Sequence, residues 1–303
     1  MAGLAISSYL IPMGERGEEW IPLFSGFADL SFLWDNMWLL GILGGVFNIL
    51  IAASLLVINT RGINNVFNPR LTAAFFLLFI LLHPGSVYFN CLHPALLLFI
   101  WGQYCFIVDQ KFTSMFLLSC AALFYAPLLW TLPIVWAISI AGVADIPRVA
   151  VKSLGGLILP LVYLVCFRYM AFNDAGVFVQ QYLSHAMEFL PVLNSFRVSS
   201  LFLVLCIAAI SVHSILFMFS KLYSNSIVTE HILKMEFMCF VLSVVLVALF
   251  WGNGVLPLNM LFALPAALLF SHYFTGNINA ASARMELILL CCAAVIFRLS
   301  YFI

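Results

Sequence analysis

Acidic side chains gather near the start of the chain, and carboxylates are the residues here best suited to acid–base chemistry. An enzyme that takes a sugar from a polyprenyl-phosphate carrier needs a carboxylate base at the outer membrane face. The candidate bases in the first 35 residues are Glu15, Glu18, Glu19, Asp29 and Asp35. Two more carboxylates, Asp174 and Glu188, lie in a later polar segment. Because any external loop holds some acids, a solvated loop charge is the alternative interpretation for each of them.

A second polar set flanks two short apolar segments that end at proline-bearing turns. Irregular backbone at membrane depth is tolerated only where protein covers it or water fills a cavity, so these turns predict a vestibule at the outer face. Helices that start at its prolines would point free amides inward and favour an anion such as a phosphate. The predicted ligand-binding residues are His83, Asn90, His93, Tyr125, Arg168 and Arg197. The alternative is that the turns are ordinary helix caps.

The spacing of ligand-type residues indicates neither a metal site nor a cofactor site. His83 and His93 are ten residues apart across a turn, which is not a zinc pattern. Seven of the eight cysteines fall in or beside apolar runs, as expected of small hydrophobic side chains. The chain has no phosphate-binding Gly-rich loop and no HExxH motif. We therefore expect no metal and no cofactor.

The elements that position these residues follow from composition. The 303 residues are 65% hydrophobic and 8% charged, whereas a soluble globular chain is about 45–50% apolar and about 25% charged. A chain so apolar belongs in a lipid bilayer, and its continuous apolar runs favour helices over a barrel, whose strands alternate. The net charge of zero makes nucleic acid an unexpected partner. The prediction is an all-α, polytopic helical bundle.

Apolar runs and their polar breaks predict about ten membrane helices in a single integral membrane domain, residues 1–303. Two helices, Leu71–Leu82 and Phe112–Phe124, are too short for a bilayer core that needs about 20 residues. Residues 1–36 form an outer-face interfacial segment, and its first residues are interpreted either as the tail of a span that begins upstream or as an interfacial helix. The longest outer loop is 173–197, with a surface helix over Val177–Phe189. The other predicted spans are Met37–Ile58, Pro94–Val108, Pro127–Val143, Ser153–Phe172, Val198–Phe219, Phe237–Trp251, Leu256–Tyr273 and Met285–Phe302.

Basic residues in alternate loops predict the orientation of the chain. Four of the twelve, Arg16, Arg168, Arg197 and Arg298, fall on one side. The other side is expected to be cytoplasmic, in a bacterial inner membrane. Its loops hold Arg61, Arg70, Lys111, Arg148, Lys152, Lys221, Lys234 and Arg284.

Few polar side chains interrupt the apolar runs. His213 is the ionisable exception, and we interpret it as an interhelical hydrogen-bonding residue rather than a proton relay. A polar loop is predicted over Lys221–Glu236, so no Asp, Glu, Lys or Arg is expected in the middle of a span. Ion-coupled transporters usually need such a group.

Several motifs resemble those of an uncharacterised family of multi-pass inner-membrane proteins from Bacteroidota. They are N-x-V-F-N-P-R at 64–70, the Phe/Leu-rich helix ending in His83-Pro84, F-Y-A-P at Phe124–Pro127, and the segment from Gly155-Gly156 to Leu159-Pro160. The resemblance covers roughly the first 170 residues and implies no catalytic residue. The layout is also similar, at the level of fold only, to part of the membrane region of lipid-linked-sugar glycosyltransferases.

Three functions remain open from the sequence, and it does not decide whether the chain is an enzyme. The first is a membrane component of cell-envelope or glycan biogenesis without an assigned catalytic activity, which binds lipid, a polyprenyl-linked glycan or other membrane proteins. The second is a glycosyltransferase-like enzyme that uses a polyprenyl-phosphate-linked sugar at the outer face. The third is a lipid or small-molecule transporter, suggested by the short helices and opposed by the absence of internal repeats.

Overall fold

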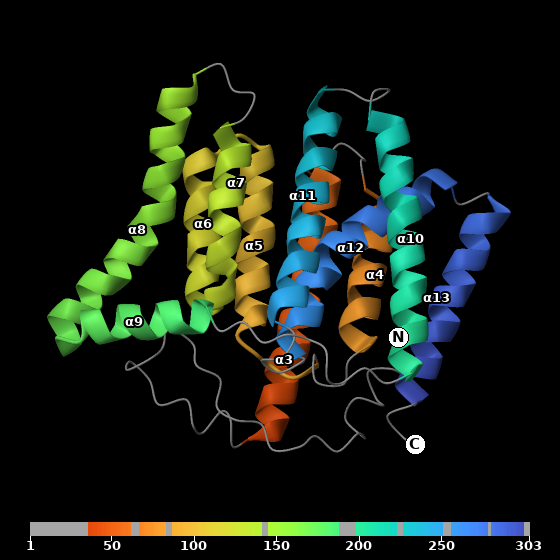
Figure 1. Cartoon of the computed structure of the whole chain (residues 1–303), viewed down its shortest axis with the longest axis horizontal. Helices are drawn as coiled ribbons and strands as arrows, with labels where there is room; N and C mark the ends of the chain where they lie inside the picture. Colours follow the sequence, from red (N-terminus) through yellow and green to blue (C-terminus); the bar gives the residue numbers. More distant parts are fainter. Residues whose placement is uncertain are drawn as a thin grey trace. The chain divides into compact units, whose positions relative to one another are not determined.

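The computed structural model describes residues 36–61, 67–82, 87–140, 145–187, 198–222, 227–250, 256–277 and 280–299. These residues form eleven α-helices, α3 to α13, and one 3₁₀-helix, η2, and they contain no strand (Figure 1). The predicted all-α class is confirmed. The helices belong to two compact units, each described below by itself.

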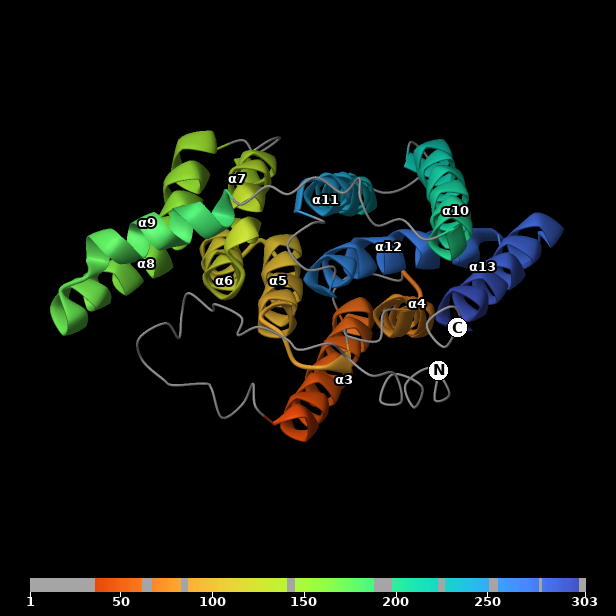
Figure 2. The same ribbon diagram turned by 60° about the horizontal axis from the view of Figure 1, so that its bottom comes forward.

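The first unit, called the α6 unit, is centred on helix α6. Helix α6 packs against α5 on one side and against α8 on the other (Figures 1 and 2). It also contacts η2 and α7. The elements of the unit are residues 37–54 of α3 (Met37–Arg61), α5 (Leu92–Ile107), α6 (Lys111–Phe124), η2 (Ala126–Trp130), α7 (Thr131–Ile140), α8 (Ile146–Phe172) and α9 (Ala175–Ala186).

Helices α6 and α8 approach closely because Gly156 has no side chain. A Cβ added at Gly156 would lie 2.3 Å from the carbonyl oxygen of Phe112 on α6. Small residues at such contacts let membrane helices pack backbone to backbone. The hydroxyl of Ser119 donates to the carbonyl oxygen of Leu157 at 2.7 Å and joins the same two helices.

The chain turns sharply after α8, and α9 runs crosswise to the helices of the α6 unit (Figure 1). Asn173 ends α8 in the left-handed conformation, at φ 54°, which asparagine tolerates better than most residues. Phe178, Tyr182 and Ala186 form the buried stripe of α9 at i, i+4 spacing. The predicted surface helix within the loop 173–197 is therefore present as a helix, with bounds shifted by two or three residues.

The second unit, called the α12 unit, is centred on helix α12, which packs against α4, α11 and α10. Helix α10 also packs against α13. Its elements are residues 55–61 of α3, α4 (Pro69–Leu82), α10 (Val198–Leu222), α11 (Ile227–Phe250), α12 (Leu256–Asn277) and α13 (Ala281–Leu299).

Helix α4 begins at Pro69 because Asn68 caps it. The Asn68 side-chain oxygen accepts hydrogen bonds from the backbone N–H groups of Arg70 and Leu71, at 3.1 and 3.3 Å. The hydroxyl of Thr72 donates to that of Ser271 at 2.8 Å, which ties α4 to α12 inside the apolar packing.

Three helices in the described part of the chain are long and apolar enough to cross a membrane. They are Met37–Ile58, Ile146–Phe172 and Phe202–Ser220. The sequence predicts all three, and the structure extends the second toward its N-terminus. The remaining predicted membrane segments are also helical, although η2 precedes α7 where one helix is expected.

The predicted polar loop Lys221–Glu236 is wrong from residue 227 onward, because α11 begins at Ile227. Glu230 lies in its first turn, where the helix dipole favours an acid, and pairs with Lys234 one turn later at 2.5 Å. These contacts extend the helix past its apolar part. Glu236 thereby becomes an interior residue of a helix, with only 2% of its surface exposed.

Candidate functional site

Many of the predicted site residues lie outside the residues that the structure describes. These are the carboxylates Glu15, Glu18, Glu19, Asp29, Asp35 and Glu188, together with His83 and Arg197. Their roles stay predictions. Asn90, His93, Tyr125, Arg168 and Asp174 are described, and all five belong to the α6 unit.

Asn90 and His93 come together at the start of α5 and are fully buried. The Asn90 side-chain oxygen accepts a hydrogen bond from the Leu92 N–H at 3.0 Å. The Asn90 N–H donates to Nδ1 of His93 at 3.2 Å. The His93 ring stacks on Phe89 and meets the edge of Phe47, with centroids about 6 Å apart. Both polar residues therefore build the first turn of α5, as the helix-cap interpretation expects.

Tyr125 lies at the junction between α6 and η2. Its backbone N–H donates to the carbonyl oxygen of Ala121 at 3.1 Å, and its own carbonyl oxygen accepts from Leu128 at 3.1 Å. Pro127 follows within the first two positions of η2, where it needs no donor. The backbone of Tyr125 thus forms the turn itself, and its side chain is only partly buried.

Arg168, a predicted phosphate-binding residue, forms an ion pair with Asp174 at the corner between α8 and α9. Its guanidinium group lies 5.0 Å from the ring centres of both Phe172 and Phe178, within cation–π range. Only 7% of the Arg168 side chain is exposed. The predicted cation and the predicted carboxylate therefore neutralise each other between two aromatic rings.

Helix α9 is held in place beside this ion pair by two further hydrogen bonds. The Tyr182 hydroxyl donates to the carbonyl oxygen of Ala122 at 3.0 Å, and the Trp130 indole donates to that of Ala186 at 2.7 Å. Burial raises the pKa of the Tyr182 hydroxyl above its ordinary value, so that it stays a donor.

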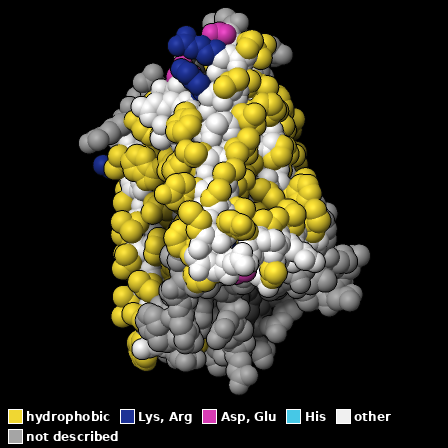
Figure 3. Space-filling view, turned by 90° about the vertical axis from the view of Figure 1, so that its left-hand side faces the viewer, with side chains coloured by type: hydrophobic (Ala, Val, Ile, Leu, Met, Phe, Trp, Pro, Cys, Tyr) yellow, Lys and Arg dark blue, Asp and Glu magenta, His cyan; other side chains and the backbone are white. Residues whose placement is uncertain are grey.

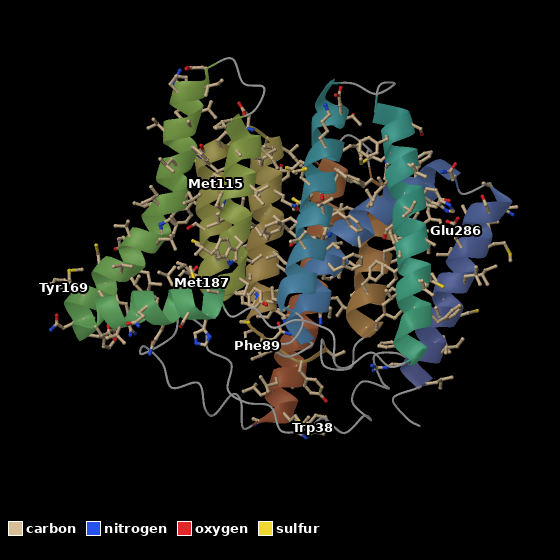
Figure 4. All side chains as sticks on the ribbon, viewed as in Figure 1. Trp38, Phe89, Met115, Tyr169, Met187 and Glu286 are labelled. Carbon is tan, nitrogen blue, oxygen red and sulfur yellow. The ribbon has the colours of Figure 1, made fainter. Side chains whose placement is uncertain are left out.

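Sequence reasoning missed the partner of His213. Nδ1 of His213 on α10 lies 2.6 Å from Oε1 of Glu286 on α13. The Tyr273 hydroxyl on α12 lies near the same carboxyl group. Figure 4 labels Glu286 on α13. The interhelical hydrogen bond predicted for His213 is confirmed, and the signal for its partner was the one acidic residue within α13.

Sequence reasoning also placed Glu236 wrongly, in a polar loop rather than within a helix. It lies inside α11 with 2% of its surface exposed, and its Oε2 has no hydrogen-bond partner in the described part of the chain. Buried ionisable groups in membrane helices are costly and often functional.

The described polar residues serve structural roles more readily than catalytic ones. Among them no group of three or more His, Cys, Asp and Glu side chains is arranged to hold a metal ion. All eight cysteines are free thiols. The paired polar groups, Asn90 with His93, Arg168 with Asp174 and His213 with Glu286, fix helix positions.

Comparisons with protein-family models, with curated proteins and with solved structures found no match to this chain. Its function is therefore inferred from its own residues.

Proposed function

We propose that this chain is a multi-pass protein of the bacterial inner membrane that serves cell-envelope or glycan biogenesis by binding, without a chemical step of its own. The observation that supports the lack of a chemical step is that four described candidate residues of the α6 unit pair with one another. Asn90 and His93 cap α5, and Arg168 and Asp174 close the corner between α8 and α9. Side chains that stabilise helix positions in this way are not free to exchange protons with a substrate.

In the proposed arrangement about ten helices cross or enter the bilayer, and α9 lies along its outer surface. The buried stripe of α9 faces the α6 unit. Its exposed side mixes the polar Gln180, Gln181, Ser184 and His185 with the apolar Val177 and Leu183, which suits a helix at the membrane interface.

The distribution of charge on α8 supports the proposed orientation. Arg148 and Lys152 are exposed in its first two turns. The space-filling view of the α8 side shows Lys and Arg side chains near one end and hydrophobic side chains along the rest (Figure 3). This polarity fits a cytoplasmic end followed by a lipid-facing helix.

The partners expected from this function are bilayer lipid, a polyprenyl-linked glycan or another membrane protein. Purification of the tagged chain in a mild detergent should recover a stoichiometric partner or lipid. Recovery of a lone monomer without either would contradict the proposal. A set of alanine variants distinguishes the proposed binding function from the glycosyltransferase alternative, because loss of function in one folded variant would favour the enzyme. The residues to replace are Glu15, Glu18, Glu19, Asp29 and Asp35.

The buried carboxylates support a second candidate function, a lipid or small-molecule transporter. Glu236 within α11 and the His213–Glu286 pair between α10 and α13 are the protonatable groups that such proteins place in their spans. Proton uptake by liposomes that contain the purified chain tests this reading. Uptake that is lost in Glu236→Gln or Glu286→Gln would favour transport, and no uptake would exclude proton coupling.

A further inference from the structure

His213 lies near the middle of the apolar stretch of α10, yet its side chain is 54% exposed. The stretch runs from Phe202 to Ser220, so His213 is two residues from its centre. At about 1.5 Å per residue this is about 3 Å from the midplane. Ionisable residues at this depth almost always face a protein interior or a polar partner.

The positions of the protons in the His213–Glu286 pair decide which hydrogen-bonding group His213 presents on its exposed side. A net charge is costly in hydrocarbon, so the neutral forms of the His213–Glu286 pair are favoured. In one form an imidazolium faces a carboxylate, and in the other a protonated Glu286 donates to Nδ1. In both forms Nε2 bears a hydrogen. Because Nδ1 is engaged by Glu286, Nε2 is the ring nitrogen left for a further hydrogen-bond partner.

The residues beside His213 form a stripe suited to another helix. Leu205, Ala209, Val212, Leu216 and Phe219 are all exposed on α10. They are spaced by alternating steps of four and three residues, which is the seam along which two helices pack with knobs in holes. Most helix pairs in membranes cross at the small angle that this spacing produces. His213 is next to Val212, at the edge of this seam.

We propose that the α10 stripe with His213 is the docking site for a membrane-spanning helix of another protein, which places an Asn, Gln, Ser or Thr oxygen opposite Nε2. The inference rests on the proposed function, since it names the partner's chemistry. A neutral acceptor is specified because a carboxylate would restore the net charge that the pair avoids.

The depth of His213 and the symmetry of dimers exclude two other occupants. A lipid headgroup lies about 15 Å from the midplane of a core about 30 Å thick, beyond the reach of Nε2. A second copy of the chain, docked through the same stripe, would form a two-fold interface in which residue i meets residue j and j meets i. The stripe residues that His213 would then meet are all apolar and carry no side-chain acceptor.

Photo-crosslinking in membranes of the native host tests the site in the full chain. A photoactivatable residue replaces Leu216 in the stripe or, as a control, Val244, which is exposed on α11 of the same unit. Each is combined with His213, His213→Leu or His213→Gln, the last of which keeps an N–H donor. Thermal unfolding of every variant in detergent shows whether it is folded.

We expect position 216 to cross-link to an apolar span with a central Asn, Gln, Ser or Thr, identified by mass spectrometry. His213→Leu should lower the yield about fivefold, the size of one hydrogen bond between membrane helices, and His213→Gln should restore most of it. A cross-link that His213→Leu leaves unchanged would overturn the site but leave the proposed function standing. A product of two copies of the chain would overturn the predicted partner. Absence of any cross-link at either position would count against both proposals.

Discussion

Two pairs of polar side chains, one pair in each unit, differ in how exposed they are. Arg168 and Asp174 join α8 to α9, and Arg168 lies between two phenylalanine rings with 7% of its side chain exposed. His213 and Glu286 join α10 to α13, but 54% of the His213 side chain is exposed. The first pair is enclosed by its own unit, whereas the second has an open side.

The difference separates a structural role from a binding role. An enclosed pair stabilises the chain only if its geometry compensates for the loss of water, and removal of one partner leaves a buried charge. An open pair stabilises the chain little and keeps a donor for another molecule. We therefore expect substitutions at the enclosed pair to change folding, and those at the open pair to change binding.

The largest expected effect is at the enclosed pair. Arg168→Ala should lower the free energy of unfolding by about 2–3 kcal/mol, somewhat less than for a fully buried pair, because 33% of the Asp174 side chain is exposed. Denaturant unfolding in detergent measures it. As a control, Arg168→Lys keeps the charge but not the planar group between the rings, so it should recover part of the loss. Wild-type stability in Arg168→Ala would remove the structural role assigned to this pair.

The next largest effect is expected at the contact between α6 and α8, in the same unit as that pair. Gly156→Ala should cost about 1–3 kcal/mol because of overpacking, since its Cβ would meet the Phe112 carbonyl oxygen on α6 at 2.3 Å. Gly155 is the matched control, with its nearest neighbour at 3.8 Å. Gly155→Ala should leave stability unchanged or raise it by up to about 1 kcal/mol, because alanine favours helix. Equal costs at both positions would contradict the close approach of α6 and α8.

A smaller effect is expected from the hydroxyl that holds α9. Tyr182→Phe removes the hydrogen bond to Ala122 and should cost about 1 kcal/mol. Because burial raises the pKa of Tyr182, the folded chain keeps this proton after the unfolded chain has lost it. Stability should then fall as pH rises above about 10, the ordinary tyrosine value. The phenylalanine variant should lose less stability than wild type over that range in unfolding titrations, and parallel curves would contradict the assignment.

The smallest effect on folding is expected at the open pair. His213→Leu should change the free energy of unfolding by about 0.5 kcal/mol or less, because a pair with one exposed partner contributes little to stability. The same unfolding measurement checks it beside Arg168→Ala. A loss at His213 as large as at Arg168 would mean that both pairs are structural, and the contrast between them would fail.

Local signals in the sequence predicted most of the helices. Pro69 marks the start of α4, the apolar run Met37–Ile58 forms a helix long and apolar enough to cross a membrane, and the polar segment after α8 contains the helix α9. These features depend on residues within one or two turns. The start of α11 was not predicted. Taken singly, Glu230 and Lys234 are typical of a loop, whereas their pairing one turn apart stabilises a helix.

The partners of the polar residues were less predictable. Asn90 and His93 are three residues apart and were grouped in advance, whereas His213 and Glu286 are separated by 73 positions. Such a pairing depends on which faces of α10 and α13 meet, and that follows from packing of the whole unit. Arg168 and Asp174 are close in sequence, but their pairing needs the left-handed turn at Asn173.

The most direct test of the central claim compares the amount of partner that co-purifies with wild type, His213→Leu and Arg168→Lys at equal amounts of folded chain. We expect a membrane protein to co-purify with wild type in stoichiometric amount. About fivefold less of it should co-purify with His213→Leu, and an undiminished amount with folded Arg168→Lys. Equal recovery with wild type and His213→Leu, or a wild-type chain that purifies without a partner, would contradict the central claim.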